Sequence, residues 1–231
     1  MIRLGRSVAR RQQRALRTAT PGPLAEFLRA GSPGRDTPLA DLPLLALDIE
    51  TTGLDPRTDR VLSLGWVPVD GGRVVLGGAG HVVVSDAGEV GQSATVHGIT
   101  DDALATGSRL DEVLPEVLAA LSGRVLLAHF ARIETEFLGS ACERLWGAGM
   151  PCEVVDTFEL ERRAVGGVWG GATPPGALRL WAARQRRGLP VYRAHEALTD
   201  ALACAELYLA QRAELEARSP GTTTTLRQVV A

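Results

Sequence analysis

The sequence feature that most constrains the fold is the apolar run LLALDIE, residues 44–50, which ends in two acids. A short apolar run followed by the turn-forming residues TTGLDPRTD predicts a buried strand. Asp48 and Glu50 lie two residues apart, so on a strand they share one face while Ile49 points to the other. Such a pair can be an ordinary solvated strand end. Unpaired carboxylates at a buried strand end are costly, however, and a hard cation such as Mg²⁺ would neutralise them.

The elements that follow predict a mixed α/β sheet. The short β-branched runs VLSLGWVPV, RVVLGG and HVVVS are separated by glycine turns and predict an antiparallel three-strand meander. Helices and strands then alternate: a helix at 111–121, the strand VLLAH, a helix at about 134–146, the strand EVVDTF, helices near 160 and at about 178–187, and a last helix at about 196–215. We therefore expect a mixed five-stranded sheet flanked by helices.

Length and composition favour one domain with extensions. At 231 residues, the chain divides into a basic helix with a Pro/Gly-rich wrapping segment (1–43), a compact domain (44–215) and a flexible C-terminal tail (216–231). The three cysteines lack any CxxC spacing, which argues against a disulfide framework or a zinc knuckle. No apolar run approaches the roughly 20 residues of a membrane span. A secretory signal would need an apolar segment after the first arginines, and none follows them. We expect a cytoplasmic protein.

The net charge of −2 predicts no partner by itself. A nucleic acid would have to meet a local positive patch. The arginine-rich segment 3–17 has roughly helical spacing and offers such a patch. It can serve as a docking element for a protein partner, as an arm that contacts phosphates, or simply as a solvated face.

Three further residues are candidates for the same site. His195 and Asp200 stand at the entrance of the last predicted helix, where His195 is expected just before the helix and facing the same cleft as Asp200. Alternatively, His195 caps that helix and Asp200 is exposed. Glu134 begins the helix after VLLAH, where an acid can also just favour the helix dipole.

Together these segments resemble the DEDDh exonuclease family, which includes the proofreading subunit of bacterial DNA polymerase III, ribonuclease T and oligoribonuclease. The resemblance covers about residues 44–211. The first motif matches as LDIETTGLDP and the third as HEALTDALACAELYL, while TVHGIT and VVDTFEL match connecting elements. The second motif departs from the usual His-Asn-Ala-any-Phe-Asp, because Phe130 replaces asparagine and Glu134 replaces aspartate. Glutamate keeps the charge but adds a methylene.

The resemblance implies a ribonuclease H-like fold and a 3′-to-5′ exonuclease that uses two divalent cations, Mg²⁺ or Mn²⁺. It implies that Asp48 bridges both ions, that Glu50 and Asp200 complete the first site, and that Glu134 supports the second. His195 would be the general base. The alternative is a catalytically weakened nucleic-acid-binding or regulatory module that keeps the fold, which the altered second motif motivates.

The resemblance also implies contacts to the 3′ end of single-stranded DNA or RNA, without deciding between the two. The terminal nucleotide would meet Thr51, Thr52 and Leu54. His97 would lie against the same nucleotide, although it can equally pack a turn. Phe130 would stack on a base, with core packing as the alternative.

Overall fold

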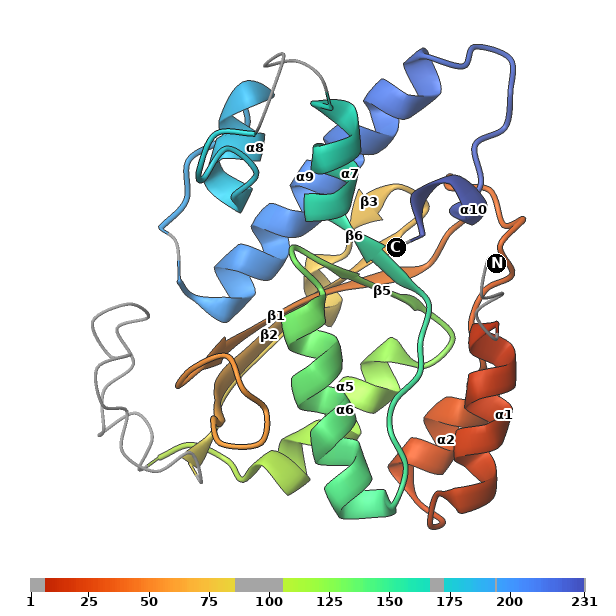
Figure 1. Cartoon of the computed structure of the whole chain (residues 1–231), viewed down its shortest axis with the longest axis vertical. Helices are drawn as coiled ribbons and strands as arrows, with labels where there is room; N and C mark the ends of the chain where they lie inside the picture. Colours follow the sequence, from red (N-terminus) through yellow and green to blue (C-terminus); the bar gives the residue numbers. More distant parts are fainter. Residues whose placement is uncertain (1–6, 86–105, 167–172, 194, 231) are drawn as a thin grey trace.

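The computed structural model describes residues 7–85, 106–166, 173–193 and 195–230, which form a mixed sheet between two layers of helices (Figure 1). The strand order is β3-β2-β1-β5-β6, and β4 also pairs with β2. The central strand β1 is antiparallel to β2 and parallel to β5, and β5 is parallel to β6. The strands are β1 (Leu44–Thr51), β2 (Val61–Asp70), β3 (Arg73–Val74), β4 (Gly80–Val83), β5 (Val125–Ala128) and β6 (Val154–Asp156). The expected mixed α/β architecture is confirmed.

The sheet has six strands where five were expected, and the runs RVVLGG and HVVVS contribute one short strand each instead of forming successive strands of a meander. β3 and β4 both pair with β2, and the short 3₁₀ turn η1 (Leu76–Gly78) separates them. Pro68 lies on β2 opposite this break. Its carbonyl accepts a hydrogen bond from the Val75 amide at 2.8 Å, but a proline has no N–H to return. The ladder is therefore interrupted, and the chain turns away before it pairs again.

The helices form one layer on each side of the sheet (Figure 1). One layer contains α1 (Val8–Thr18), α2 (Pro23–Ala30), α5 (Leu110–Leu121) and α6 (Arg132–Trp146). The other contains α7 (Thr157–Ala164), α8 (Leu180–Arg186), α9 (Ala197–Ala217) and α10 (Leu226–Val229). Within the described residues, no helix is both long and apolar enough to span a bilayer.

The alternation of side chains along β1 divides the core in two. Leu45, Leu47 and Ile49 pack with the layer that contains α2, α5 and α6. Leu44 and Ala46 face the opposite way and pack with α9 and α10. Because the strand period is two, Asp48 and Glu50 continue this second face beyond the apolar residues. The sequence pattern thus directs both acids towards α9.

The N-terminal and C-terminal segments both pack on the domain. In the Pro/Gly-rich segment, LAEFL belongs to α2, whose buried Leu24 and Phe27 join the core below the sheet. The last residues differ from the expected flexible tail. Leu226 of α10 is fully buried, and its amide donates to the Thr37 carbonyl at 3.0 Å. The tail is therefore held against the wrapping segment through contacts that its low-complexity sequence does not reveal.

Candidate active site

The acids of β1 lie where the central strand extends beyond its neighbour. The parallel pairing of β1 with β5 ends at Ala46 and Leu127, whereas pairing with β2 continues through Asp48 and Glu50. The last residues of β1 are therefore not paired with β5. Asp48 and Glu50 are both half-buried there, at the end of a face whose remaining side chains are apolar.

Glycine on β2 allows α9 to approach these acids. Gly65 is the antiparallel partner of Asp48. A Cβ atom at Gly65 would overlap the backbone of Ala197 and Leu198, the first residues of α9. Only a residue without a side chain lets the start of this helix rest directly on the sheet. The close approach places Asp200, in the first turn of α9, beside the acids of β1.

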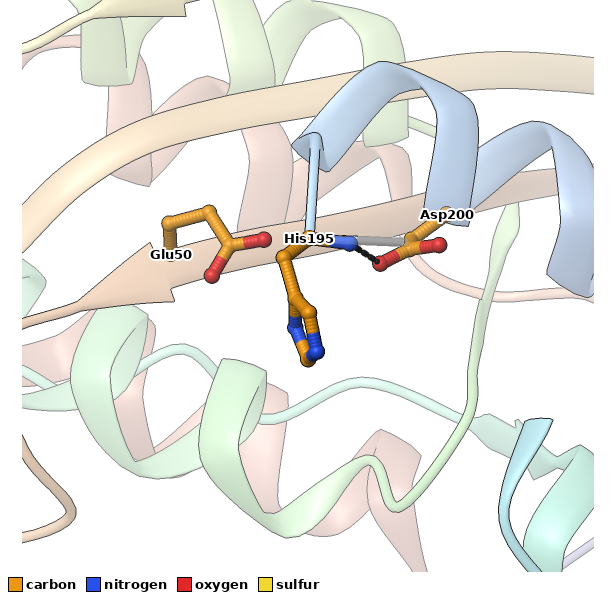
Figure 2. A group of neighbouring side chains, drawn as sticks. All are labelled: Glu50, His195 and Asp200. Atoms are coloured by element: carbon orange, nitrogen blue, oxygen red, sulfur yellow. Dashed lines mark hydrogen bonds between the residues drawn. The ribbon is translucent and has the colours of Figure 1, made fainter. Parts of the chain in front are cut away.

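The third motif brings a histidine and a carboxylate to Glu50. Figure 2 shows the Glu50 carboxylate directed towards His195 and Asp200. One potential ligand atom of each of these three residues lies within 4.8 Å of the other two. His195 precedes α9, and its backbone amide donates to Asp200 Oδ2 at 2.8 Å. The geometry places His195 on a loop at the mouth of the site, as expected from the sequence.

The second motif contributes Glu134 from the first turn of α6. Glu134 is only 3% exposed, and its Oε2 atom has no hydrogen-bond partner within the described chain. Its charge is close enough to Asp48 to raise the pKa of that carboxyl, after the larger effect of burial. A buried, unpartnered carboxylate oxygen costs free energy unless something binds it. An N-terminal helix-dipole role alone does not account for this burial.

The four acids together hold more negative charge than the surrounding protein compensates. Burial raises the pKa of Asp48 well above its usual range, and Glu134, Asp200 and Glu50 raise it further. Burial and then the Asp200 charge raise the pKa of Glu50 to about 7. Burial raises the pKa of Glu134 to about 8 and also raises that of Asp200. Oxygen ligands with such excess charge fit a hard divalent cation.

Two residues of this site have strained backbones. Phe130 has φ 70° and His195 has φ 68°, and they are the described non-glycine residues with positive φ. Left-handed geometry disfavours residues with a Cβ atom, and it concentrates at functional positions. Each residue lies immediately before a helix that carries one of the acids. The strain therefore coincides with the two turns that position Glu134 and Asp200.

Asp156 organises one of these turns and was not singled out from the sequence. Its carboxylate accepts hydrogen bonds from the backbone amides of Phe130 at 2.9 Å and Ala131 at 3.0 Å. It also caps α7 by accepting from the Phe158 amide at 2.9 Å. Asp156 thus ties the end of β6 to the start of α6, which fixes Glu134. The segment VVDTFEL was the available signal, but its role depends on contacts across 25 or more residues.

The structure describes four of the residues that were expected to contact substrate: Thr51, Thr52, Leu54 and Phe130. Thr51 and Thr52 directly follow Glu50; the Thr52 amide donates to the Arg60 carbonyl at 3.0 Å, and the Thr52 hydroxyl accepts from the Arg60 amide at 3.0 Å. Leu54 is 74% exposed, which is unusual for a leucine in this apolar-cored chain. Phe130 is 44% exposed and makes an edge contact with Phe158. His97 lies outside the described residues.

A mixed sheet whose central strand ends in carboxylates, with further acids from the next two motifs, defines the ribonuclease H-like nuclease class. The family model described as exonuclease, RNase_T, matches residues 45–208. The chain belongs to this exonuclease family. It is accordingly an enzyme of the exonuclease class.

The chain is similar to curated proteins that carry DNA polymerase III names. It is 29% identical over 163 residues to a protein named DNA polymerase III subunit epsilon from Treponema pallidum, covering 71% of this chain and 73% of the relative. It is 34% identical over 187 residues to an epsilon-like protein from Rhodobacter capsulatus, covering 79% of this chain and 25% of the relative. A PolC-type polymerase from Thermotoga maritima is 29% identical over 175 residues. That alignment spans 75% of this chain but only 12% of the polymerase.

Two solved structures share the fold. Exonuclease X in complex with 5′ overhanging duplex DNA has a TM-score of 0.58 at 22% identity, covering 80% of this chain and 98% of that protein. The nuclease domain of 3′hExo, a DEDDh family member bound to rAMP, has a TM-score of 0.61 at 16% identity. It covers 77% of this chain and 95% of that domain. At these identities, the likeness concerns the fold.

Proposed function

We propose that this chain hydrolyses phosphodiester bonds stepwise from the 3′ end of DNA or RNA, with two divalent cations, Mg²⁺ or Mn²⁺. The observation that carries the proposal is the convergence of Glu50, His195 and Asp200 within 4.8 Å, beside the half-buried Asp48 and the buried Glu134. The family match supports the same chemistry.

The arrangement of the four carboxyls is suited to binding two cations. The charges of Glu134, Asp200 and Glu50 all raise the pKa of Asp48. The Asp48 carboxyl is therefore suited to lie between two ions. Glu50 and Asp200 would complete one cation site, and Glu134 would support the other with its unpartnered oxygen. When bound, such a pair of ions activates a water and relieves charge on the leaving oxygen.

His195 would accept the proton of the attacking water. Imidazole is the side chain best suited to exchange a proton near neutral pH. The hydrogen bond from the His195 amide to Asp200 Oδ2 holds the loop at the mouth of the site. The side chain itself is exposed, so it can reorient when a substrate enters. These features suit a general base that is positioned by its backbone.

The terminal nucleotide would be held beside the first motif. Thr51 and Thr52 offer backbone groups next to Glu50, and the exposed Leu54 side chain offers an apolar surface to the base. Phe130 is the candidate stacking residue on the α6 side. From the sequence, His97 is proposed as a further contact to the same nucleotide. Base contacts of this kind do not discriminate DNA from RNA, so both remain substrates to test.

A polymerase is a proposed protein partner, supported by the names of the relatives. The helix α1 lies outside the residues that match the family, 45–208. This arginine-rich helix is one candidate surface for a protein partner, and a phosphate backbone is the other candidate for the same surface. A cytoplasmic setting remains a prediction from the sequence.

The proposal is tested with 20-nucleotide single strands of DNA and RNA labelled at the 5′ end. With Mg²⁺ or Mn²⁺, the native protein should produce a descending ladder that EDTA abolishes. The same strands labelled at the 3′ end should release labelled mononucleotide first. Binding without metal-dependent cleavage would contradict the proposal and favour a weakened binding or regulatory module. Asp200→Asn is the matched inactive control.

A further inference from the structure

The helix α1 presents a face of arginines to solvent. Arg10, Arg14 and Arg17 follow the spacing i, i+4, i+7 and therefore share one side of the helix, with Arg11 at its edge. All four side chains are exposed, and the helix contains no acid. Its opposite side carries the buried Val8 and Gln12, which attach α1 to the domain. The arginine face is thus displayed on a fixed element.

Within the described residues, the ion pairs of the protein leave these four arginines uncompensated. Arginines elsewhere behave differently: Arg184 and Arg187 on and after α8 are each paired with glutamates. Residues 1–35 contain eight arginines and the single acid Glu26, so they carry +7, while the rest of the chain carries −9. A polyanion is consequently attracted to this end and repelled by the remainder.

The helix α6 runs from the acids towards the C-terminal end of α1. Glu134 begins α6 at the site, whereas the carbonyl of Trp146, at its other end, accepts from the Thr20 amide just after α1 at 2.9 Å. Twelve residues at ~1.5 Å each give about 18 Å. Figure 1 shows α1 at the edge of its helix layer, with α2 between it and α6. At ~3.4 Å per stacked nucleotide, a strand covers this length of α6 in roughly five nucleotides.

We propose that α1 binds the phosphate backbone of the substrate strand, about five or more nucleotides from the 3′ end being cleaved. This inference rests on the proposed function and assigns its substrate a second contact. Guanidinium groups bind phosphate oxygens in a bidentate manner. The four arginines are interspersed with glutamine, alanine and leucine and no aromatic residue, so the contact recognises backbone and not bases. This contact holds long strands on the protein, whereas a very short strand does not reach it.

The test compares R10Q/R14Q/R17Q with the native protein on a dinucleotide and on a 20-nucleotide single strand. For the 20-mer, KM should rise roughly 10-fold or more in 50 mM salt, because three phosphate contacts are lost. The slope of log affinity against log salt should decrease by about 2, from ~0.7 per phosphate on single strands. The kcat/KM for the dinucleotide should change less than twofold.

The control R109Q/R162Q/R227Q removes the same charge from arginines that are paired at the surface. It should leave the 20-mer KM and the salt slope near native values. Unchanged KM and slope in R10Q/R14Q/R17Q, with active native protein, would overturn the inference and leave an acidic protein surface as the occupant of α1. If the native protein cleaves nothing, the proposed function fails, and fluorescence anisotropy of the labelled 20-mer with both triple variants still decides the role of α1.

Discussion

Glu134→Gln should stabilise the metal-free protein at alkaline pH while it removes activity. Burial raises the pKa of Glu134 from 4.5 to about 8, so the folded state holds a proton that the unfolded state releases within this window. The unfolded state therefore binds fewer protons, and stability falls as pH rises from about 4.5 to 8. Glutamine has nearly the same shape and does not titrate.

The magnitude follows from the size of the shift. Each pKa unit corresponds to about 1.4 kcal/mol, so between pH 5 and pH 8 the Glu134 carboxyl costs the native protein up to about 4 kcal/mol. For a chain of this size, 1 kcal/mol changes Tm by roughly 2–4 °C. In EDTA, Glu134→Gln should thus have a Tm roughly 8–16 °C above native at pH 8 and close to native at pH 5.

The assay is thermal or urea unfolding in EDTA at pH 5 and pH 8, repeated with saturating Mg²⁺. Divalent cations should stabilise the native protein at pH 8 and stabilise Glu134→Gln less, because a cation ligand has been lost. Glu136→Gln is the matched control on the same helix, where an exposed ion pair with Arg132 is removed. It should change stability by less than about 1 kcal/mol at either pH. A Glu134→Gln protein that is less stable than native at pH 8 would show that burial does not hold the Glu134 carboxyl in its protonated form.

Three other substitutions test the supports of the site. Gly65→Ala forces a methyl group against the backbone of Leu198, so unfolding should show a loss of about 1–3 kcal/mol and cleavage should fall; Gly139→Ala, which meets no atom within 4 Å, should be neutral or slightly stabilising. Asp156→Ala leaves the amides before α6 unpaired, so a loss of roughly 1–3 kcal/mol is expected, and unchanged stability would argue against this role. His195→Ala should reduce single-turnover cleavage by roughly 10²- to 10⁴-fold without lowering Tm; native rates would reject the general base.

The sequence predicts the central strand and the third motif well because their signals are local. The apolar run before Asp48 and Glu50 marks a buried strand, and its period of two assigns both acids to one face. The long periodic helix after His195 places Asp200 in its first turn. These inferences need only the nearest neighbours in the chain, and the structure confirms the elements within a few residues.

Other features could not be predicted because they depend on contacts distant in sequence. Gly65 is an unremarkable strand residue until α9, more than 130 residues later, is packed against it. The effect of Pro68 depends on the strand that lies opposite it, because a proline cannot donate a hydrogen bond to that strand. For Glu134, its place in the sequence favoured a helix-dipole role and only the family resemblance implied a site role, which its burial next to Asp48 supports. The C-terminal residues likewise fold on a segment near the N-terminus.

The central claim is that the carboxyls of Asp48, Glu50, Glu134 and Asp200 hold the cations of an exonuclease site. Its most direct test is anomalous diffraction from crystals of the native protein grown with Mn²⁺ and a nucleoside monophosphate. Two Mn²⁺ peaks about 3.5–4 Å apart are expected, with Asp48 between them and Glu134 at the second. No peak among these carboxyls, or a single peak that leaves Glu134 without a metal contact, would contradict it.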